Sequence, residues 1–138
     1  MVSKTFLFAG RATFVIENST GESVTVKVTK STKEYKDRNG NPYPPSYYVK
    51  LRYGNDEWTY AGVLKEDGRI LVTPKSKMIP NDRRLKIAQW GIVLIMQEKD
   101  VPVGYRLEHT GRCGRCNKML RDEVSIKLGI GPVCEGMV

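Results

Sequence analysis

The only histidine of the chain and all three of its cysteines fall within one stretch, and this feature restricts the fold more than any other. The four residues follow the pattern H-x3-C-x2-C-x17-C and are His109, Cys113, Cys116 and Cys134. Zinc favours a closed tetrahedron of thiolate and imidazole ligands, and three cysteines with one histidine form one of its common structural sets. We therefore expect one structural zinc ion that holds the C-terminal part of the chain.

The spacing of these residues supports a zinc site. Two cysteines separated by two residues, one of which is Gly114, can form a turn in which both thiolates point toward the same ion. The segment from Cys116 to Cys134 is long enough for a short helix or hairpin to fold over the metal. A water molecule or one of three carboxylates is an alternative to His109 as the fourth ligand, the carboxylates being Asp122, Glu123 and Glu135. A water ligand would make the zinc site open to catalysis.

Other roles for the cysteines are open alternatives. Cys113 and Cys116 match the spacing of a redox pair, but the surrounding sequence lacks the βαβ pattern of thioredoxin-type proteins. A disulfide framework would leave one of the three cysteines unpaired, and no signal peptide precedes them. A third alternative is that the cysteines are buried thiols and the histidine is incidental. The zinc site is the hypothesis that uses all four residues.

The same stretch resembles a known sequence signature. It contains G-R-C-G-R-C-N-K-M-L, then S-I, then G-I-G-P-V-C, and this order is similar to the C-terminal signature of a family of uncharacterised, often phage-encoded proteins with a zinc-binding domain of unknown function. Upstream, the segments A-G-R-A-T-F, N-S-T-G-E-S-V-T-V-K-V and Y-A-G-V-L resemble the N-terminal half of that family. The resemblance implies a zinc-bearing, phage-type protein that acts in the bacterial cytoplasm, and it implies no reaction.

Length and hydropathy indicate a small globular protein with two parts. A chain of 138 residues has the length of one domain and can bury about two thirds of its unfolded surface. We expect a domain over residues 1–100 and a zinc-binding module over residues 101–138. The longest apolar run, Ile92–Met96, is far shorter than the roughly 20 residues that span a bilayer, and the N-terminus lacks the apolar region of a signal peptide. These features predict a protein of a reducing cytosol without membrane attachment, and the resemblance implies that this is the cytoplasm of a bacterial host.

Alternating hydropathy predicts a sheet in the first half of the chain. Val24, Val26 and Val28 alternate with polar residues, as expected of a half-buried strand. Similar segments are separated by turn sequences such as N-S-T-G and K-E-D-G. The expected strands cover residues 12–17, 24–29, 47–53, 58–64 and 69–73. The predicted fold class is α+β: an antiparallel sheet of about five strands with one packed helix, followed by a small zinc-knuckle module.

One helix is expected after the strands, over residues 82–97. Asn81 or Asp82 can cap its N-terminus, and apolar residues recur on one face at helical spacing. Gly91 costs about 1 kcal/mol in a helix interior relative to alanine. The alternative is therefore a break at Gly91, with Ile92–Met96 as a buried strand.

The charge of the chain favours polyanionic partners. There are 23 lysine and arginine residues against 15 aspartate and glutamate residues, a net charge of +8. Basic proteins bind phosphate-rich partners by direct contact and counterion release. The candidate contacts lie near the cysteines, in an exposed loop over residues 31–45 and on one expected strand: Arg112, Arg115, Lys118, Arg121, Lys33, Lys36, Arg38, Lys50 and Arg52. A solvated surface explains each of these clusters as well as a binding patch does.

Aromatic residues in the expected strands have two interpretations. Tyr48, Trp58 and Tyr60 could stack on bases, as aromatic side chains of sheet-face nucleic-acid readers do. The same side chains also serve as core or cross-strand packing in many sheets.

Binding is the class of function that the sequence favours, and we expect no enzyme. The single histidine is assigned to the metal, and the chain contains no G-x-S-x-G, Walker, H-E-x-x-H or EF-hand pattern. No small-molecule cofactor is expected, because the G-I-G element lacks the other residues of a dinucleotide or phosphate loop. Two binding hypotheses result: contact with nucleic acid, or binding and inhibition of a host or anti-phage defence protein.

Overall fold

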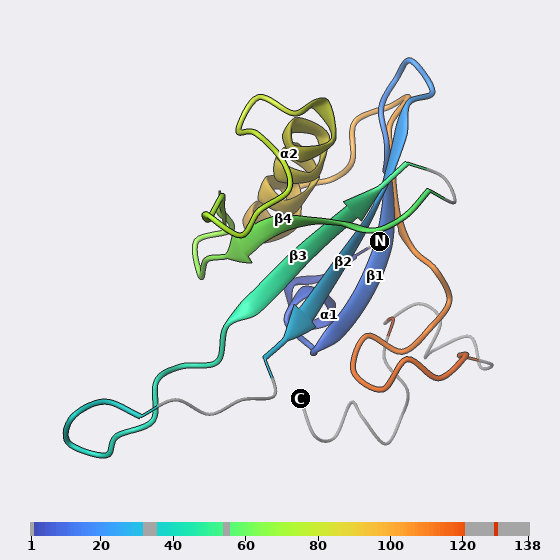
Figure 1. Ribbon diagram of the computed structural model, residues 1–138. Helices are drawn as coiled ribbons and strands as arrows, with labels where there is room; N and C mark the ends of the chain where they lie inside the picture. The colour runs from blue at the N-terminus through green and yellow to red at the C-terminus, as the bar shows by residue number, and fades with distance from the viewer. Residues whose placement is uncertain (1, 32–35, 54–55, 121–128, 130–138) are drawn as a thin grey trace.

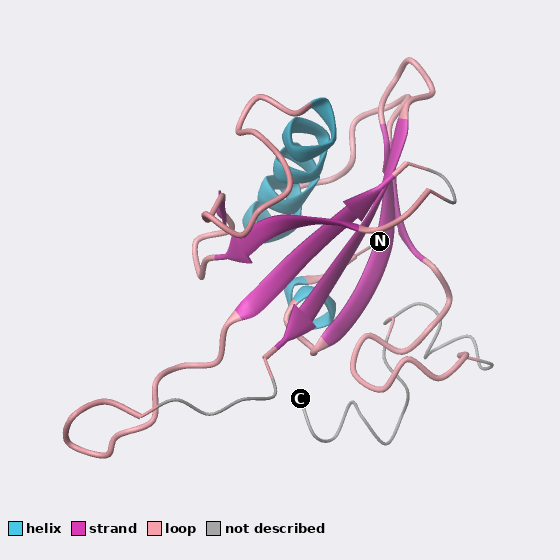
Figure 2. Ribbon diagram, in the orientation of Figure 1, coloured by secondary structure: helices cyan, strands magenta, loops and turns pink. Residues whose placement is uncertain are grey.

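The computed structural model describes residues 2–31, 36–53, 56–120 and 129. They form an α+β fold with one antiparallel sheet of six strands and one main helix (Figures 1 and 2). The strands are β1 (Arg11–Glu17), β2 (Ser23–Lys30), β3 (Tyr47–Arg52), β4 (Thr59–Leu64), β5 (Ile70–Leu71) and β6 (Arg106–His109), and the helices are α1 (Lys4–Leu7) and α2 (Arg83–Gln97). Their order in the sheet is β5-β4-β3-β2-β1-β6. The predicted α+β class and the single long helix are confirmed.

Strands β1 to β3 lie side by side within the sheet, and in each of them buried apolar side chains alternate with more exposed ones. Phe14 of β1 lies opposite Val26 of β2, which lies opposite Leu51 of β3, and all three side chains are fully buried. Burial of one such side chain contributes about 1.5–3 kcal/mol. The alternate residues point to the other side of the sheet. The sheet therefore has a core face, on which α1 and α2 lie, and an open face, which carries residues such as Lys27 and Lys50.

Helix α2 covers the core face, and Asp82 and Glu98 set its ends. The Asp82 carboxylate accepts a hydrogen bond from the Arg84 backbone N–H at 2.9 Å and so caps the N-terminus. Glu98 adopts a left-handed conformation with φ of 55°, which ends the helix. Helix α1 lies on the same side of the sheet as α2 (Figure 1). Neither helix in the described part of the chain has the length and apolar character needed to cross a membrane.

Gly91 does not interrupt α2, so the alternative of a buried strand at Ile92–Met96 is wrong. The helix runs through Gly91 because this residue faces Ile16 of β1. A Cβ added at Gly91 would lie 2.3 Å from Ile16 Cδ1 and 2.9 Å from Ile16 Cγ1. The missing side chain lets the helix approach the sheet closely, and the packing gained there offsets the poor helix propensity of glycine.

The number of strands is higher than the five expected. The additional strand β6 pairs with β1 and places Leu107 opposite Ile16. It has four residues, too few for a hydropathy pattern to identify it. The strand expected over residues 69–73 is shortened to β5, which has two residues. β6 joins residues beyond position 100 to the main sheet. The predicted domain boundary between residues 100 and 101 stays a prediction.

Helix α1 is a short element that the sequence did not predict. The Ser3 hydroxyl accepts a hydrogen bond from the Phe6 N–H at 3.1 Å and caps it. Phe6 and Leu7 are buried, with exposed fractions of 1% and 0%. Tertiary burial rather than intrinsic propensity therefore stabilises so short a helix.

Candidate functional site

Residues 111–120, named here the cysteine loop, follow β6 and form a tight turn. The Cys113 N–H donates a hydrogen bond to the Lys118 carbonyl at 2.8 Å, and the Asn117 N–H donates to the Cys113 carbonyl at 2.9 Å. Asn117 has a left-handed φ of 64° directly after Cys116. These backbone bonds place both cysteines of the C-x2-C pair on one short segment.

The surroundings of the two cysteines fit those of metal ligands. Cys113 is 1% exposed and Cys116 is half-buried. The Arg115 N–H donates a hydrogen bond to the Cys113 sulfur at 3.4 Å. Such a donor stabilises a thiolate relative to a thiol, and the thiolate is the form that binds zinc. The turn therefore suits a pair of zinc-binding sulfurs.

His109, at the end of β6, contacts both α1 and the cysteine loop. Its Nδ1 accepts a hydrogen bond from the Gly111 N–H at 3.0 Å, and its ring centre lies 5.5 Å from that of Phe6. A neutral imidazole that accepts at Nδ1 carries its hydrogen on Nε2. The bond from Gly111 therefore occupies one of the two ring nitrogens through which His109 could hold a metal.

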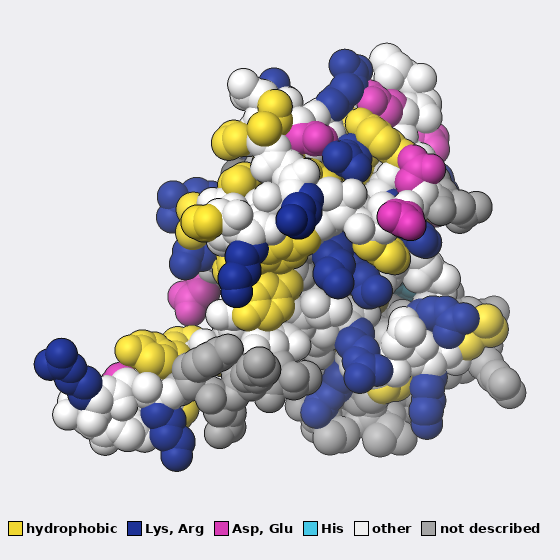
Figure 3. All heavy atoms as spheres, in the orientation of Figure 1, with side chains coloured by type: hydrophobic (Ala, Val, Ile, Leu, Met, Phe, Trp, Pro, Cys, Tyr) yellow, Lys and Arg dark blue, Asp and Glu magenta, His cyan; other side chains and the backbone are white. Residues whose placement is uncertain are grey.

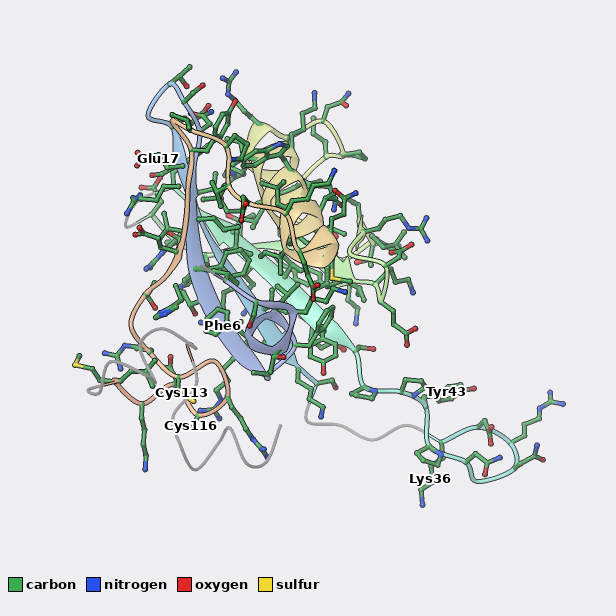
Figure 4. All side chains as sticks on the ribbon, turned by 180° about the vertical axis from the view of Figure 1, so that it is seen from behind. Phe6, Glu17, Lys36, Tyr43, Cys113 and Cys116 are labelled. Atoms are coloured by element: carbon green, nitrogen blue, oxygen red, sulfur yellow. The ribbon has the colours of Figure 1, made fainter. Side chains whose placement is uncertain are left out.

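The cysteine loop is docked on the N-terminal part of the chain. The Arg11 N–H donates to the Gly114 carbonyl at 2.6 Å, and the Gly114 N–H donates to the Gly129 carbonyl at 2.7 Å. Gly114 lies directly against Phe6, because an added Cβ would be 2.6 Å from Phe6 Cδ2. Figure 4 shows the two labelled cysteines on the segment next to Phe6. The position of the loop thus depends on α1 and on the start of β1.

The convergence of the four predicted zinc ligands stays a prediction. Cys134 lies outside the described residues, as do the alternative ligands Asp122, Glu123 and Glu135. Within residues 2–31, 36–53, 56–120 and 129, no group of three or more histidine, cysteine and acidic side chains is placed to hold a metal. Of the predicted set, the described residues place Cys113 and Cys116 on one turn and His109 on the strand that leads into it.

Two lysines lie directly opposite each other on the open face of the sheet. Lys27 of β2 pairs with Lys50 of β3, which pairs in turn with Tyr60 of β4. Trp58 lies beside them: the Lys27 Nζ is 4.9 Å and the Arg52 guanidinium carbon 4.2 Å from its ring centre. Two cations, Lys27 and Arg52, therefore lie over one tryptophan, and Lys50 is paired with Lys27 on the same face. Lys50 and Arg52 were among the predicted contacts.

These cations have no acidic partners in the described part of the chain. None of the ion pairs there involves Lys27, Lys50 or Arg52, and Arg52 Nε is buried without a hydrogen-bond partner. Arg106, at the edge of the sheet, differs because it pairs with Glu17 at 3.1 Å. Figure 3 shows lysine and arginine side chains gathered with hydrophobic ones over the strands. Among the residues that the structure describes, no carboxylate pairs with the positive charge at the centre of the open face.

The predicted contacts of the cysteine loop are at its surface. The Arg112 guanidinium donates to the Asn117 carbonyl at 3.2 Å, and Lys118 is exposed. Arg115 is half-buried. Arg121 lies outside the described residues. Arg112 therefore helps to hold the turn, whereas Lys118 is available to a partner.

Lys36 and Arg38 lie on a hairpin that extends away from the sheet (Figure 1). The Asp37 carboxylate accepts a hydrogen bond from the Asn39 N–H at 2.8 Å, which fixes the turn of this hairpin. Lys33 lies outside the described residues. The hairpin and the cysteine loop project from different sides of the molecule (Figures 1 and 4). The structure therefore does not bring these predicted contacts together.

Arg11 and Lys27 belong to the open face but were not among the predicted contacts. Arg11 lies opposite Thr29, and Lys27 lies opposite Thr13, all on the open face. The alternating valines of β2 already placed Lys27 on the polar side of its strand. Its neighbours on other strands depend on the register, which a single sequence does not specify.

A comparison with protein families matches the C-terminal part of the chain. No curated protein and no solved structure matches the chain. The matched residues begin in β6 and include the cysteine loop, whereas the expected resemblance of the N-terminal half lies outside them. Residues 108–138 thus match a family of unknown function (DUF6011).

Proposed function

We propose that this is a small zinc-binding protein that binds single-stranded nucleic acid on the open face of its sheet. The observation that carries the proposal is the direct pairing of Lys27 with Lys50, without an acidic partner among the described residues. Like charges directly opposite each other destabilise a sheet. A phosphate group near the two ammonium groups would remove their repulsion, so this face favours a polyanion.

Aromatic side chains on the same face suit unpaired bases. Trp58 lies beside Lys27 and Arg52, and the rings of Tyr48 and Tyr60 meet edge to face with centres 6.2 Å apart. Sheet-face proteins bind single strands by stacking bases on such rings while cations contact the phosphates. A duplex hides the faces of its bases, so we expect it to bind more weakly than a single strand.

Zinc has a structural role in this proposal. Four residues would hold it: Cys113, Cys116, Cys134 and His109. The ion would supply a crosslink between the cysteine loop and the residues that follow it. His109 would lose the hydrogen bond that its Nδ1 accepts from the Gly111 N–H on binding the ion. No reaction is assigned to the ion.

The proposal is tested by binding of fluorescent oligonucleotides of about ten nucleotides, a length within the range of single-strand sites. Fluorescence anisotropy would measure the Kd for single-stranded DNA, single-stranded RNA and duplex DNA over a series of salt concentrations. Removal of one cation that binds a phosphate lowers the salt slope for a single strand by about 0.7. We expect Lys50→Gln to weaken binding and to reduce the slope by about that amount. The matched control is Lys86→Gln, which removes an exposed lysine of α2, away from the open face.

Two outcomes would contradict the proposal. One is the absence of binding to either single strand at about 50 mM salt, where phosphate contacts are strongest. The other is an equal decrease in affinity in Lys50→Gln and Lys86→Gln, since that result would mean that overall charge alone determines binding. Polyglutamate of the same length is a further control, and binding as tight as that of the oligonucleotide would point to an acidic protein partner instead.

A further inference from the structure

We infer that a cavity between the open face and the cysteine loop is a pocket for one nucleotide, with its phosphate held by Arg11 and Lys27. The cavity has a volume of about 320 Å³ and is lined by Arg11, Thr13, Lys27, Thr29, Trp58 and Asn117. These residues come from β1, β2, the residue before β4 and the cysteine loop. The inference deepens the proposed function and rests on it, and its test separates the two.

The side chains that line the floor of the pocket are all hydrogen-bond donors. Arg11 lies opposite Thr29, and Lys27 lies opposite Thr13, so each pair joins a cation to a hydroxyl. The two cations are diagonal neighbours on adjacent strands, a separation of about 7–8 Å that long side chains can bridge. A phosphate between them would receive charge-assisted bonds from Arg11 and Lys27 and further bonds from the two hydroxyls.

No acidic group in the described part of the chain competes for these cations. Neither Arg11 nor Lys27 takes part in an ion pair there, and no carboxylate of the described residues lines the cavity. The Lys27 ammonium instead lies 4.9 Å from the centre of the Trp58 ring. A cation over an aromatic ring is held more weakly than one bonded to a phosphate. Lys27 can therefore leave the ring when an anion enters.

The pocket is larger than a phosphate group requires. Its volume of about 320 Å³ is roughly ten times the share of one water molecule in the liquid and falls at the lower end of small-molecule sites. Trp58 forms an apolar wall beside the cationic floor, and a base can stack on that wall once Lys27 has moved. A nucleotide combines a charged phosphate with an aromatic base, so a pocket with cations beside an aromatic wall suits it.

The cysteine loop closes one side of this pocket. Asn117 directly follows Cys116, and its left-handed φ of 64° is part of the turn. Its side chain supplies both a donor and an acceptor, which suit the edge of a base or a ribose hydroxyl. Asn117 is thus the residue through which the proposed zinc-binding turn would influence the ligand.

Intrinsic fluorescence provides the test, because the chain has two tryptophans and only Trp58 lines the pocket. In a Trp90→Phe background, emission after selective excitation of tryptophan reports on Trp58 alone. The ligands to be titrated are adenosine and uridine monophosphates, inorganic phosphate and the single-stranded oligonucleotide. We expect both monophosphates to change the emission, and inorganic phosphate to bind more weakly because it cannot stack. Lys27→Gln and Arg11→Gln should each weaken monophosphate binding about tenfold, as removal of one charged hydrogen bond does.

The outcomes distinguish this inference from the proposed function. Both variants are judged against Lys86→Gln, with circular dichroism to show that each remains folded. If the oligonucleotide binds and Lys50→Gln weakens it, but the monophosphates do not bind and Arg11→Gln behaves like Lys86→Gln, the pocket inference is wrong and the proposed function stands. If the monophosphates bind and the two variants weaken them while no oligonucleotide binds, the pocket stands and the proposed function is wrong.

Discussion

At the scale of single residues, Asp82 shows how one carboxylate fixes the start of a helix. It accepts hydrogen bonds from the Arg84 backbone N–H at 2.9 Å and from the Arg84 guanidinium at 3.1 Å. The Arg84 side chain, more than any other group, holds the pKa of the Asp82 carboxyl below its ordinary value of 3.8. The sequence predicted a cap at Asn81 or Asp82, because both residue types are frequent N-caps before an amphipathic run, and the structure shows that Asp82 is the cap.

The first prediction concerns Asp82→Ala. We expect the free energy of unfolding to fall by about 1 kcal/mol at pH 7, as removal of an N-cap usually causes. Since the pKa of Asp82 is lower in the folded protein, its stabilisation is present above the ordinary value of 3.8 and is lost as the pH falls through the lowered pKa. Urea denaturation at pH 7 and at pH values below 3.8 measures both effects. A difference between variant and wild type that does not shrink in acid would contradict this prediction.

At the scale of elements, α2 and β6 mark what hydropathy could and could not predict. The helix was predicted because its apolar residues recur along one face for fifteen residues. The close approach of Gly91 to the sheet could not be predicted, because its partner Ile16 lies on β1, far away in the sequence. β6 was missed for a similar reason: four residues carry too little periodicity, and their partner strand is remote.

The second prediction concerns Gly91→Ala. Alanine has the better helix propensity by about 1 kcal/mol, yet we expect the variant to be less stable. The new Cβ would lie 2.3 Å from Ile16 Cδ1, and overpacking of this kind costs about 1–3 kcal/mol. Thermal denaturation of Gly91→Ala measures the change. The double variant Gly91→Ala with Ile16→Val, which removes the clashing Cδ1, should recover part of the stability, and no recovery would show that the contact with Ile16 is not the cause.

At the scale of the whole molecule, the cysteine loop packs against residues near the N-terminus. The Arg11 N–H donates to the Gly114 carbonyl, and Gly114 packs on Phe6. The spacing of the cysteines predicted a turn with two sulfurs, because that pattern is local. The docking surface could not be predicted, since it is formed by α1 and β1. The grouping of the cations on the open face could not be predicted either, because it depends on the strand register that brings Lys27 opposite Lys50.

The third prediction concerns the metal. We expect purified protein to contain about one equivalent of zinc by elemental analysis, and Cys113→Ser or a chelator to remove it. Removal of the ion should loosen the cysteine loop, so hydrogen exchange at the Arg11 amide should become faster. The amide of Val26, in the centre of the sheet, is the internal control. Absence of zinc from fresh protein, or unchanged exchange at Arg11 after its removal, would contradict the prediction.

The position of Phe6 has a consequence for the way this protein is made. Phe6 is 1% exposed, and the residues that contact its ring include His109, Gly114 and Gly129. Synthesis on the ribosome runs from the N-terminal to the C-terminal side, so Phe6 emerges before His109, Gly114 and Gly129, which cover part of its ring. Until then the part of the ring that these residues cover is open to water and to chaperones. Completion of the core around Phe6 therefore has to wait until these three residues have been synthesised.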